Sequence, residues 1–158
     1  MSLVSGVETL IQREAGYLDL QKWDDWLSLY AEDCEYWVPA AKGQTDAKTQ
    51  VSLFHEDRTL METRIKRLLH PLAHSLVKPL RTCHVVGGIV IEDDGANGGD
   101  IVATSSFHML EQHGDRQRLF GGFYTHRLRP SGGNLLIRAK RVDLTNCDMP
   151  LEVIETFI

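Results

Sequence analysis

Histidines provide the first candidate chemistry in this sequence. His70 and His74 have the i, i+4 spacing that would place both on one face of a helix beginning at Pro71, but no Glu lies between them to act as a base. A solvated helix start or a subunit contact is therefore the favoured interpretation of this pair. His108 and His126 are better candidates for a general base, because both fall in long β-like runs and a curved sheet can turn alternate side chains into a cavity. A hydrogen-bonded or exposed histidine is still the simpler interpretation of each.

The sequence lacks a complete metal-binding pattern. Iron and zinc sites need several converging His, Cys or carboxylate ligands, and the Cys-x-x-Cys, His-Glu-x-x-His and Cys-x-His patterns are all absent. Cys83 and His84 are adjacent, so in a strand their side chains would face opposite sides. We therefore expect no metal-binding residues in this chain.

Patterns for nucleotide binding, hydrolysis and acid–base catalysis are also missing or incomplete. The Gly-x-Gly-x-x-Gly and phosphate-loop patterns are absent, and Gly87-Gly88 lies within a strand pattern, where it indicates a bulge or bend. No serine lies in a Gly-x-Ser-x-Gly elbow. The acidic pairs Asp24-Asp25 and Glu32-Asp33 could suggest an acid and a base, but neighbouring residues do not share a helix face. These patterns therefore disfavour nucleotide binding and give no positive evidence for hydrolase chemistry.

The composition is that of an ordinary globular domain. The 158 residues are 42% hydrophobic and 25% charged, so we expect a single domain over residues 1–158. The net charge of −5 would repel nucleic acid. No apolar stretch approaches the ~20 residues of a membrane span, and residues 1–8 lack signal-peptide features, so we expect a cytoplasmic protein with no membrane contact. Three cysteines, far apart and odd in number, favour reduced, buried thiols: Cys34, Cys83 and Cys147.

Helical patterns occupy the first part of the chain. Ser5 and Glu8 form a capping-box pattern for a first helix, and Asp19 can cap a second helix. A third helix would begin after Asp57 and end at His70-Pro71, with short β-segments at 34–38 and 52–54. The second helix carries large side chains at i, i+3, i+4 and i+7 spacing: Trp23, Trp26, Leu27 and Tyr30.

From Arg81 onward the pattern changes to β-strands. Four runs, at 82–92, 101–112, 118–128 and 135–144, are separated by glycine-rich turns. In the last run, alternation places Val142 and Leu144 on the face opposite Arg141 and Asp143. Helices followed by a strand meander predict an α+β cone, with N-terminal helices packed on one face of a curved antiparallel sheet.

Residues 14–40, EAGYLDLQKWDDWLSLYAEDCEYWVPA, resemble the N-terminal signature of the small (beta) subunits of aromatic-ring-hydroxylating dioxygenases. That family pattern contains EA-x-x-LD, W-x-x-W-L-x-L-Y and D-x-x-YW-x-P. The residues that match it are Glu14, Ala15, Leu18, Asp19, Trp23, Trp26, Leu27, Leu29, Tyr30, Asp33, Tyr36, Trp37 and Pro39. Three later blocks agree in order and spacing, at 56–65, 81–86 and 140–144, so the resemblance covers nearly the whole chain.

The resemblance implies an NTF2-like, cystatin-like cone, in agreement with the order of helices and strands. It also implies that a Rieske 2Fe-2S cluster and a mononuclear iron belong to a large alpha subunit. The beta subunits would form a trimeric, chiefly structural base of an alpha3beta3 assembly, with no site residues of their own. The whole NAD(P)H- and O2-dependent complex would cis-dihydroxylate an aromatic substrate in aromatic compound catabolism.

The short chain and residues 70–80, HPLAHSLVKPL, most resemble the branch that acts on aromatic acids such as benzoate or anthranilate. Cys83 and Gly87-Gly88 depart from the usual family residues, which bears on the subgroup rather than the fold. Two alternatives stay open, because a fold alone does not fix a function. The first is a stand-alone NTF2-like isomerase, dehydratase or cyclase with a His or Asp at the floor of the cone. The second is a small-molecule binding protein that uses the same cavity without turnover.

Overall fold

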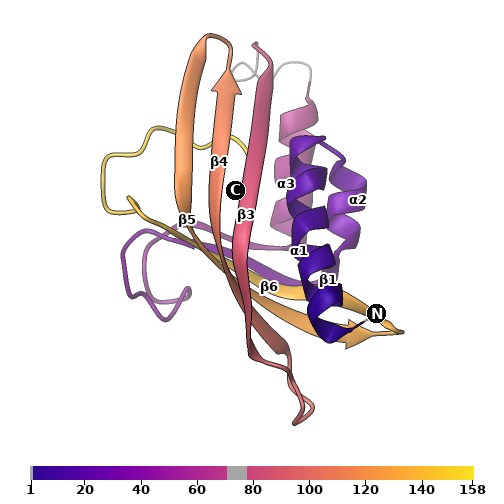
Figure 1. Ribbon diagram of the computed structural model, residues 1–158. Helices are drawn as coiled ribbons and strands as arrows, with labels where there is room; N and C mark the ends of the chain where they lie inside the picture. The colour runs from indigo at the N-terminus through magenta and orange to yellow at the C-terminus, as the bar shows by residue number, and fades with distance from the viewer. Residues whose placement is uncertain (1, 71–77) are drawn as a thin grey trace.

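The computed structural model describes residues 2–70 and 78–158, in which three helices pack against one six-stranded sheet (Figure 1). The helices are α1 (Leu3–Asp19), α2 (Trp23–Ser28) and α3 (Arg58–Leu69). The strands are β1 (Tyr30–Pro39), β2 (Ser52–Asp57), β3 (Leu80–Asp93), β4 (Ile101–His113), β5 (Arg116–Ser131) and β6 (Asn134–Leu144). The predicted α+β class is confirmed, and the four predicted long strands correspond to β3 to β6.

The sheet has the order β2-β1-β6-β5-β4-β3. Strands β3 to β6 form the predicted antiparallel meander, but β1 pairs with β6 in parallel, with Tyr36 opposite Lys140. The expectation of a purely antiparallel sheet is wrong at this pair. About one hundred residues separate β1 from β6, so no hairpin fixes their relative direction, as a short turn does for neighbouring strands.

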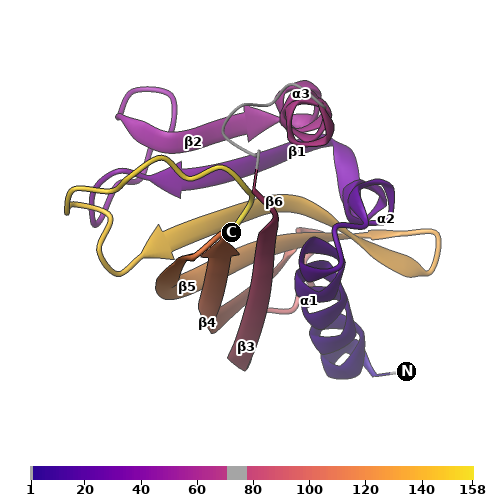
Figure 2. The ribbon, with the colours of Figure 1, turned by 90° about the horizontal axis from the view of Figure 1, so that it is seen from above.

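The helices lie on one side of the twisted sheet. Figure 2 shows the strand direction turning from β2 to β3, with α1 alongside β3 and α3 beside β1 and β2. The buried face of α1 carries Val7, Leu10, Ile11, Glu14, Ala15 and Leu18. Helical periodicity places these residues on one stripe, so α1 contributes most of its apolar surface, together with one carboxylate, to the core.

Two predicted helix caps are wrong and one is confirmed. Ser2 caps α1, with its Oγ accepting from the Ser5 N–H at 3.2 Å, so the helix begins before the predicted box. Asp19 ends α1 and binds residues of β3, which leaves α2 without a side-chain cap. Asp57 caps α3 as predicted, with its Oδ1 2.9 Å from the Leu60 N–H. His70 ends α3, also as predicted.

Helix α2 is shorter than its aromatic stripe suggested. It ends at Ser28, and Tyr30 instead begins β1, because the Leu29 carbonyl already accepts from the Ile137 N–H of β6 at 2.8 Å. Trp23, Trp26 and Tyr30 are all buried even so. The stripe therefore predicted burial correctly, although a turn of helix was predicted where the strand begins.

Smaller features give further corrections. Gly88 has φ 61°, and the strand register shifts between Gly87 and Val90, so the predicted bulge is confirmed. Cys34 and Cys147 are buried free thiols, but Cys83 is exposed, because its side chain lies on the outer face of β3. No helix within residues 2–70 and 78–158 is long and apolar enough to cross a membrane.

Candidate functional site: a buried polar network

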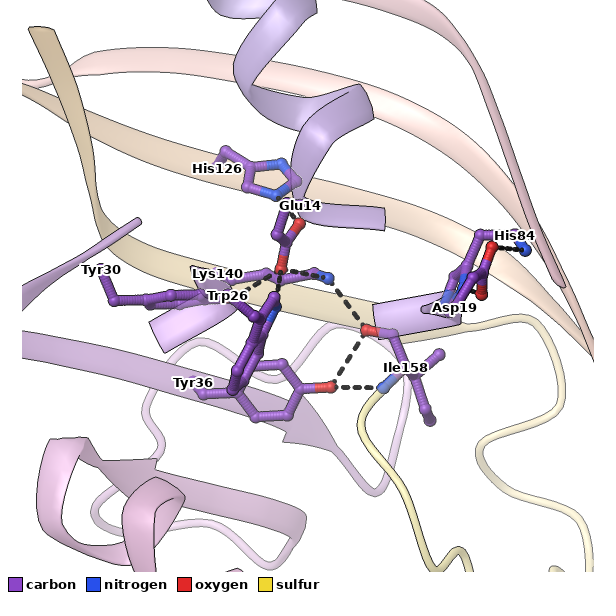
Figure 3. A network of polar contacts seen from close by, with 9 residues as sticks. All are labelled: Glu14, Asp19, Trp26, Tyr30, Tyr36, His84, His126, Lys140 and Ile158. Carbon is purple, nitrogen blue, oxygen red and sulfur yellow. Dashed lines mark hydrogen bonds and ion pairs between the residues drawn. The ribbon is translucent and has the colours of Figure 1, made fainter. Parts of the chain in front are cut away.

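A carboxylate buried under α1 is the centre of a polar network (Figure 3). Glu14 lies on the apolar stripe of the helix, and its side chain is 1% exposed. Its Oε1 accepts from Tyr30 OH at 2.6 Å, Lys140 Nζ at 2.9 Å and Trp26 Nε1 at 3.3 Å. Its Oε2 is 3.1 Å from His126 Nε2. Five elements, α1, α2, β1, β5 and β6, therefore meet at one carboxylate.

The ammonium of Lys140 has more than one partner. Besides Glu14, Nζ donates to the main-chain oxygen of Ile158 at 2.9 Å and lies 4.2 Å from the centre of the Tyr124 ring. The Tyr36 hydroxyl donates to the same Ile158 oxygen at 3.1 Å and accepts from the Ile158 N–H at 2.9 Å. Lys140 of β6 thus holds both α1 and the segment that returns after β6, and Tyr36 of β1 holds the same segment.

The contacts determine the charge states in the network. Burial opposes ionisation of Glu14, yet Lys140 and His126 hold the pKa of this carboxyl far below its usual range. Burial lowers the pKa of Lys140, and the neighbouring carboxylate opposes that shift. Because each charge stabilises the other, Glu14 and Lys140 ionise as a pair.

Burial also decides the state of the histidine. It lowers the pKa of His126, although Glu14 opposes the change, so the ring is neutral near pH 7. An ionised carboxylate can only accept, so the neutral ring donates its Nε2 proton to Glu14. His126 Nδ1 is then a buried acceptor with no partner among the described residues.

A second, smaller cluster joins the end of α1 to β3. Asp19 Oδ1 lies 2.5 Å from His84 Nδ1 and accepts from Thr82 Oγ1 at 2.8 Å, while Oδ2 accepts from the His84 main-chain N–H at 2.8 Å. Burial raises the pKa of Asp19, but the bonds from His84 outweigh it and lower the pKa overall. This cluster fastens α1 to the edge strand of the sheet.

The structure separates the two histidines that the sequence favoured. His126 faces the core from β5, whereas His108 is exposed on the outer face of β4, so they do not share a cavity. His70 ends α3, and His74 lies outside the described residues. Cys83 and His84 do face opposite sides of β3, as predicted.

Glu14 and Lys140 were not predicted as members of a site. The sequence could have indicated both, because each is a charged residue at a position where the helical or strand periodicity predicts a buried apolar side chain. Glu14 lies on the buried stripe of α1, and Lys140 alternates in step with Val142 and Leu144, which are buried as predicted. Their partners were not detectable, because the contacts depend on the register of distant strands.

Aromatic side chains pack around the network. The Phe157 ring lies 4.4 Å from the Trp26 ring, and Phe107 stacks on Tyr124 at 4.0 Å. A groove of about 880 Å³ lies on the outer face of β1, β6 and β5, where Arg141 stacks on Trp37.

No group of three or more His, Cys, Asp or Glu side chains among residues 2–70 and 78–158 is arranged to hold a metal ion. The network joins five elements of the fold, and its carboxylate is shielded from solvent.

Residues 13–150 match the family model described as "Ring hydroxylating beta subunit". The small oxygenase component of the p-cumate 2,3-dioxygenase system of Pseudomonas putida is 34% identical over 152 residues, which cover 95% of this chain and 81% of that protein. The toluate 1,2-dioxygenase subunit beta of Pseudomonas putida is 28% identical over 156 residues, which cover 96% of this chain and 94% of that protein. Among solved structures, the beta subunit of the benzoate 1,2-dioxygenase of Burkholderia mallei has a TM-score of 0.77 at 24% identity, covering 96% of this chain and 95% of that one.

Proposed function

The chain belongs to the family of ring-hydroxylating beta subunits, and from this premise we propose that it is a non-catalytic, structural subunit of an aromatic-ring-hydroxylating dioxygenase. The observation that carries the proposal is the family match over residues 13–150, together with 34% identity to a small oxygenase component across 95% of the chain. We further propose that residues 1–158 form one domain, which the single sheet supports.

The structural role is supported by the burial of the acid–base groups inside the cone. His126 and Glu14 are acid–base groups of this interior, and both are fully buried and hydrogen-bonded to each other. A general base must reach a proton on its substrate. Here the groups that could act as a base instead join five elements, so they stabilise the subunit that the partner binds.

The proposed partner is a large alpha subunit in an alpha3beta3 assembly, with the beta subunits forming a homotrimer. The alpha subunit would hold the Rieske cluster and the mononuclear iron. The complex would take electrons from NAD(P)H and use O2 to cis-dihydroxylate an aromatic acid. The relatives named as toluate and benzoate dioxygenase subunits support an aromatic acid as substrate.

Exposed apolar side chains support a function that depends on a partner. The outer face of β3, β4 and β5 has no helix over it among the described residues, and it exposes Val85, Leu110, Leu119 and Phe123. Leu110 and Leu119 are directly opposite each other, so the apolar surface is continuous between these strands. A continuous exposed patch of this kind often marks an interaction surface.

The test is to produce the chain alone, the alpha subunit alone, and the two together. Co-production is expected to yield one complex with iron and with oxygen uptake that depends on an aromatic acid such as benzoate. The isolated chain is expected to contain no iron and to consume no oxygen. Turnover of any substrate by the isolated chain, or failure to bind an alpha subunit, would contradict the proposal and favour a stand-alone enzyme or a binding protein.

A further inference from the structure

The segment after β6 returns to the interior of the cone. Figure 1 shows it, in yellow, leaving the end of β6 and running back to the C-terminal label near the sheet. Arg118 of β5 holds it midway by donating to the main-chain oxygens of Glu152 at 3.4 Å and Val153 at 3.0 Å. Beyond this point Phe157 and Ile158 are 1% and 0% exposed. The last part of the segment, from Ile154 onward, therefore fills core space, whereas Met149 and Val153 before it are exposed.

The ring of Phe157 is enclosed by aromatic rings from other elements. Its centre lies 4.4 Å from Trp26, 6.3 Å from Trp23 and 5.4 Å from Tyr36, the last in an edge-on arrangement. The guanidinium of Arg64 in α3 lies 5.5 Å from the same ring. Edge-on and tilted contacts at these distances are the geometry that aromatic pairs prefer. The surroundings therefore match an aromatic ring better than an aliphatic side chain.

The walls of this enclosure are fixed by contacts that do not involve Phe157. Trp26 donates to Glu14, and Tyr36 is held in β1 opposite Lys140 of β6. Arg64 is paired with Glu56 and stacks on Phe54 at 4.1 Å. A cavity with walls held in this way keeps its shape when its occupant is removed, which is the condition under which an apolar cavity binds a small apolar molecule.

We propose that the interior of the cone is a binding pocket for a single aromatic ring, and that this chain fills it with its own Phe157 as a tethered ligand. The main chain of Ile158 clamps the tether through Lys140 Nζ and the Tyr36 hydroxyl (Figure 3). The chemical class of a free ligand is a small neutral aromatic hydrocarbon, because the Phe157 ring is surrounded by aromatic rings and by the Arg64 guanidinium, which is attracted to the face of a ring. This inference does not depend on the identity of the partner subunit.

Tethering explains why the pocket is occupied. The buried Cys147 lies only ten residues before Phe157, and even a flexible tether of this length would give an effective concentration in the millimolar range. A free ring with similar contacts must exceed that concentration to compete. The unaltered chain is therefore expected not to respond to sub-millimolar benzene.

The test uses the full chain with Phe157→Ala and measures Tm with benzene as the probe. Benzene is expected to raise the Tm of Phe157→Ala saturably, by roughly 5 °C or more at concentrations far above its Kd, and to change the fluorescence of Trp23 and Trp26. Phe157→Leu, which refills most of the volume, and the unaltered chain are the controls, and neither should respond. Cyclohexane is the matched probe, and it should give a clearly smaller rise.

Two results would overturn the proposal. One is a Phe157→Ala chain that folds but gives no benzene response beyond that of the unaltered chain. The other is an equal response to cyclohexane, which would indicate a general apolar cavity. If Phe157→Ala does not fold alone, it is refolded with benzene present; recovery of folded chain supports the proposal, and no recovery overturns it.

Discussion

Glu14 and Lys140 form a charged pair that is almost completely buried, at 1% exposure for each side chain. Removing ions from water costs several kcal/mol for each ion, and their attraction offsets this only when further hydrogen bonds are made. Here Tyr30, Trp26 and His126 supply those bonds for the carboxylate. The pair is therefore a stable unit whose members depend on each other.

Lys140→Met tests this dependence. It leaves the Glu14 carboxylate buried without its cation, so we expect the free energy of unfolding to fall by roughly 3–5 kcal/mol. The double variant Glu14→Gln with Lys140→Met removes both charges and is expected to recover a large part of that loss. Urea unfolding of the single and double variants gives the comparison. Strictly additive losses would show that the pair is not coupled.

The depressed pKa of His126 predicts a loss of stability in acid. The unfolded ring binds a proton below its ordinary pKa of 6.5, whereas burial keeps the native ring neutral to lower pH. The unfolded state then binds more protons, so stability falls as the pH falls from about 6.5 towards the native pKa. We expect the free energy of unfolding to fall by on the order of 1 kcal/mol for each unit by which the native pKa of His126 lies below its ordinary value.

Urea unfolding at pH 7 and pH 5.5 measures this effect. His126→Gln should reduce the pH dependence, since Gln can still donate to Glu14 but does not titrate. His108→Gln is the matched control, because His108 is exposed on the outer face, and it should leave the pH dependence unchanged. An unchanged pH dependence in His126→Gln would assign the acid sensitivity to another group.

At the residue scale, sequence alternation predicted which side of a strand faces inward. It placed Cys83 opposite His84, and Arg141 and Asp143 opposite Val142, and the structure confirms both. It did not predict that Glu14 meets a lysine more than one hundred positions later. Local periodicity reports burial, whereas a partner depends on how the whole sheet is assembled.

At the scale of elements, β5 approaches β6 closely at Gly122, whereas the neighbouring Gly121 faces β4. A Cβ at Gly122 would overlap the main-chain carbonyl oxygen of Asp143, whereas a Cβ at Gly121 would lie 3.0 Å from the His108 ring. Backbone can move only if the strand pairing shifts, but the exposed His108 side chain can turn away. The two neighbouring positions should therefore differ in their tolerance of a methyl group.

We expect Gly122→Ala to lower the free energy of unfolding by roughly 1–3 kcal/mol, and Gly121→Ala to lower it by less than about 1 kcal/mol. Thermal or urea unfolding of the two variants measures the difference. Because both changes add the same atoms one residue apart, each serves as the control for the other. Equal losses of unfolding free energy in the two variants would mean that the close approach of β5 to β6 does not determine whether a methyl group is tolerated at position 122.

Element positions were predicted better than element ends and caps. The strand runs and the end of α3 at His70 follow from local patterns and turn residues. Ser5 was predicted as a cap where Ser2 acts, since two serines three residues apart offer the same local signal. Asp19 failed as a cap because β3 supplies it with two hydrogen bonds and a histidine, a tertiary effect that outweighs a local preference.

At the scale of the whole molecule, the order of helices and strands was sufficient to predict the α+β cone. The direction of β1 was not predictable, because its pairing with β6 joins the two ends of the chain. The filling of the interior was also not predictable, since the segment around Phe157 carries no strong periodic pattern. The sequence alone therefore gave no sign that Phe157 packs against Trp26 inside the cone.

The proposed homotrimer makes the last prediction, which concerns the intact isolated chain. If the chain self-associates through its exposed apolar surface, native mass should correspond to three copies. Its Tm should also rise with protein concentration, because association stabilises only the folded state. Phe123→Lys places a charge on that surface at a side chain that is 60% exposed, so it should lower the oligomer fraction with little effect on the folded monomer.

Analytical ultracentrifugation over a hundredfold concentration range, with Tm measured at each concentration, gives both quantities. Leu20→Lys is the matched control, since Leu20 is 67% exposed but follows α1 on the helix side of the molecule. A chain that stays monomeric with a constant Tm would contradict self-association. A trimer unaffected by Phe123→Lys but disrupted by Leu20→Lys would instead place the contact on the helix side, away from the outer face of the sheet.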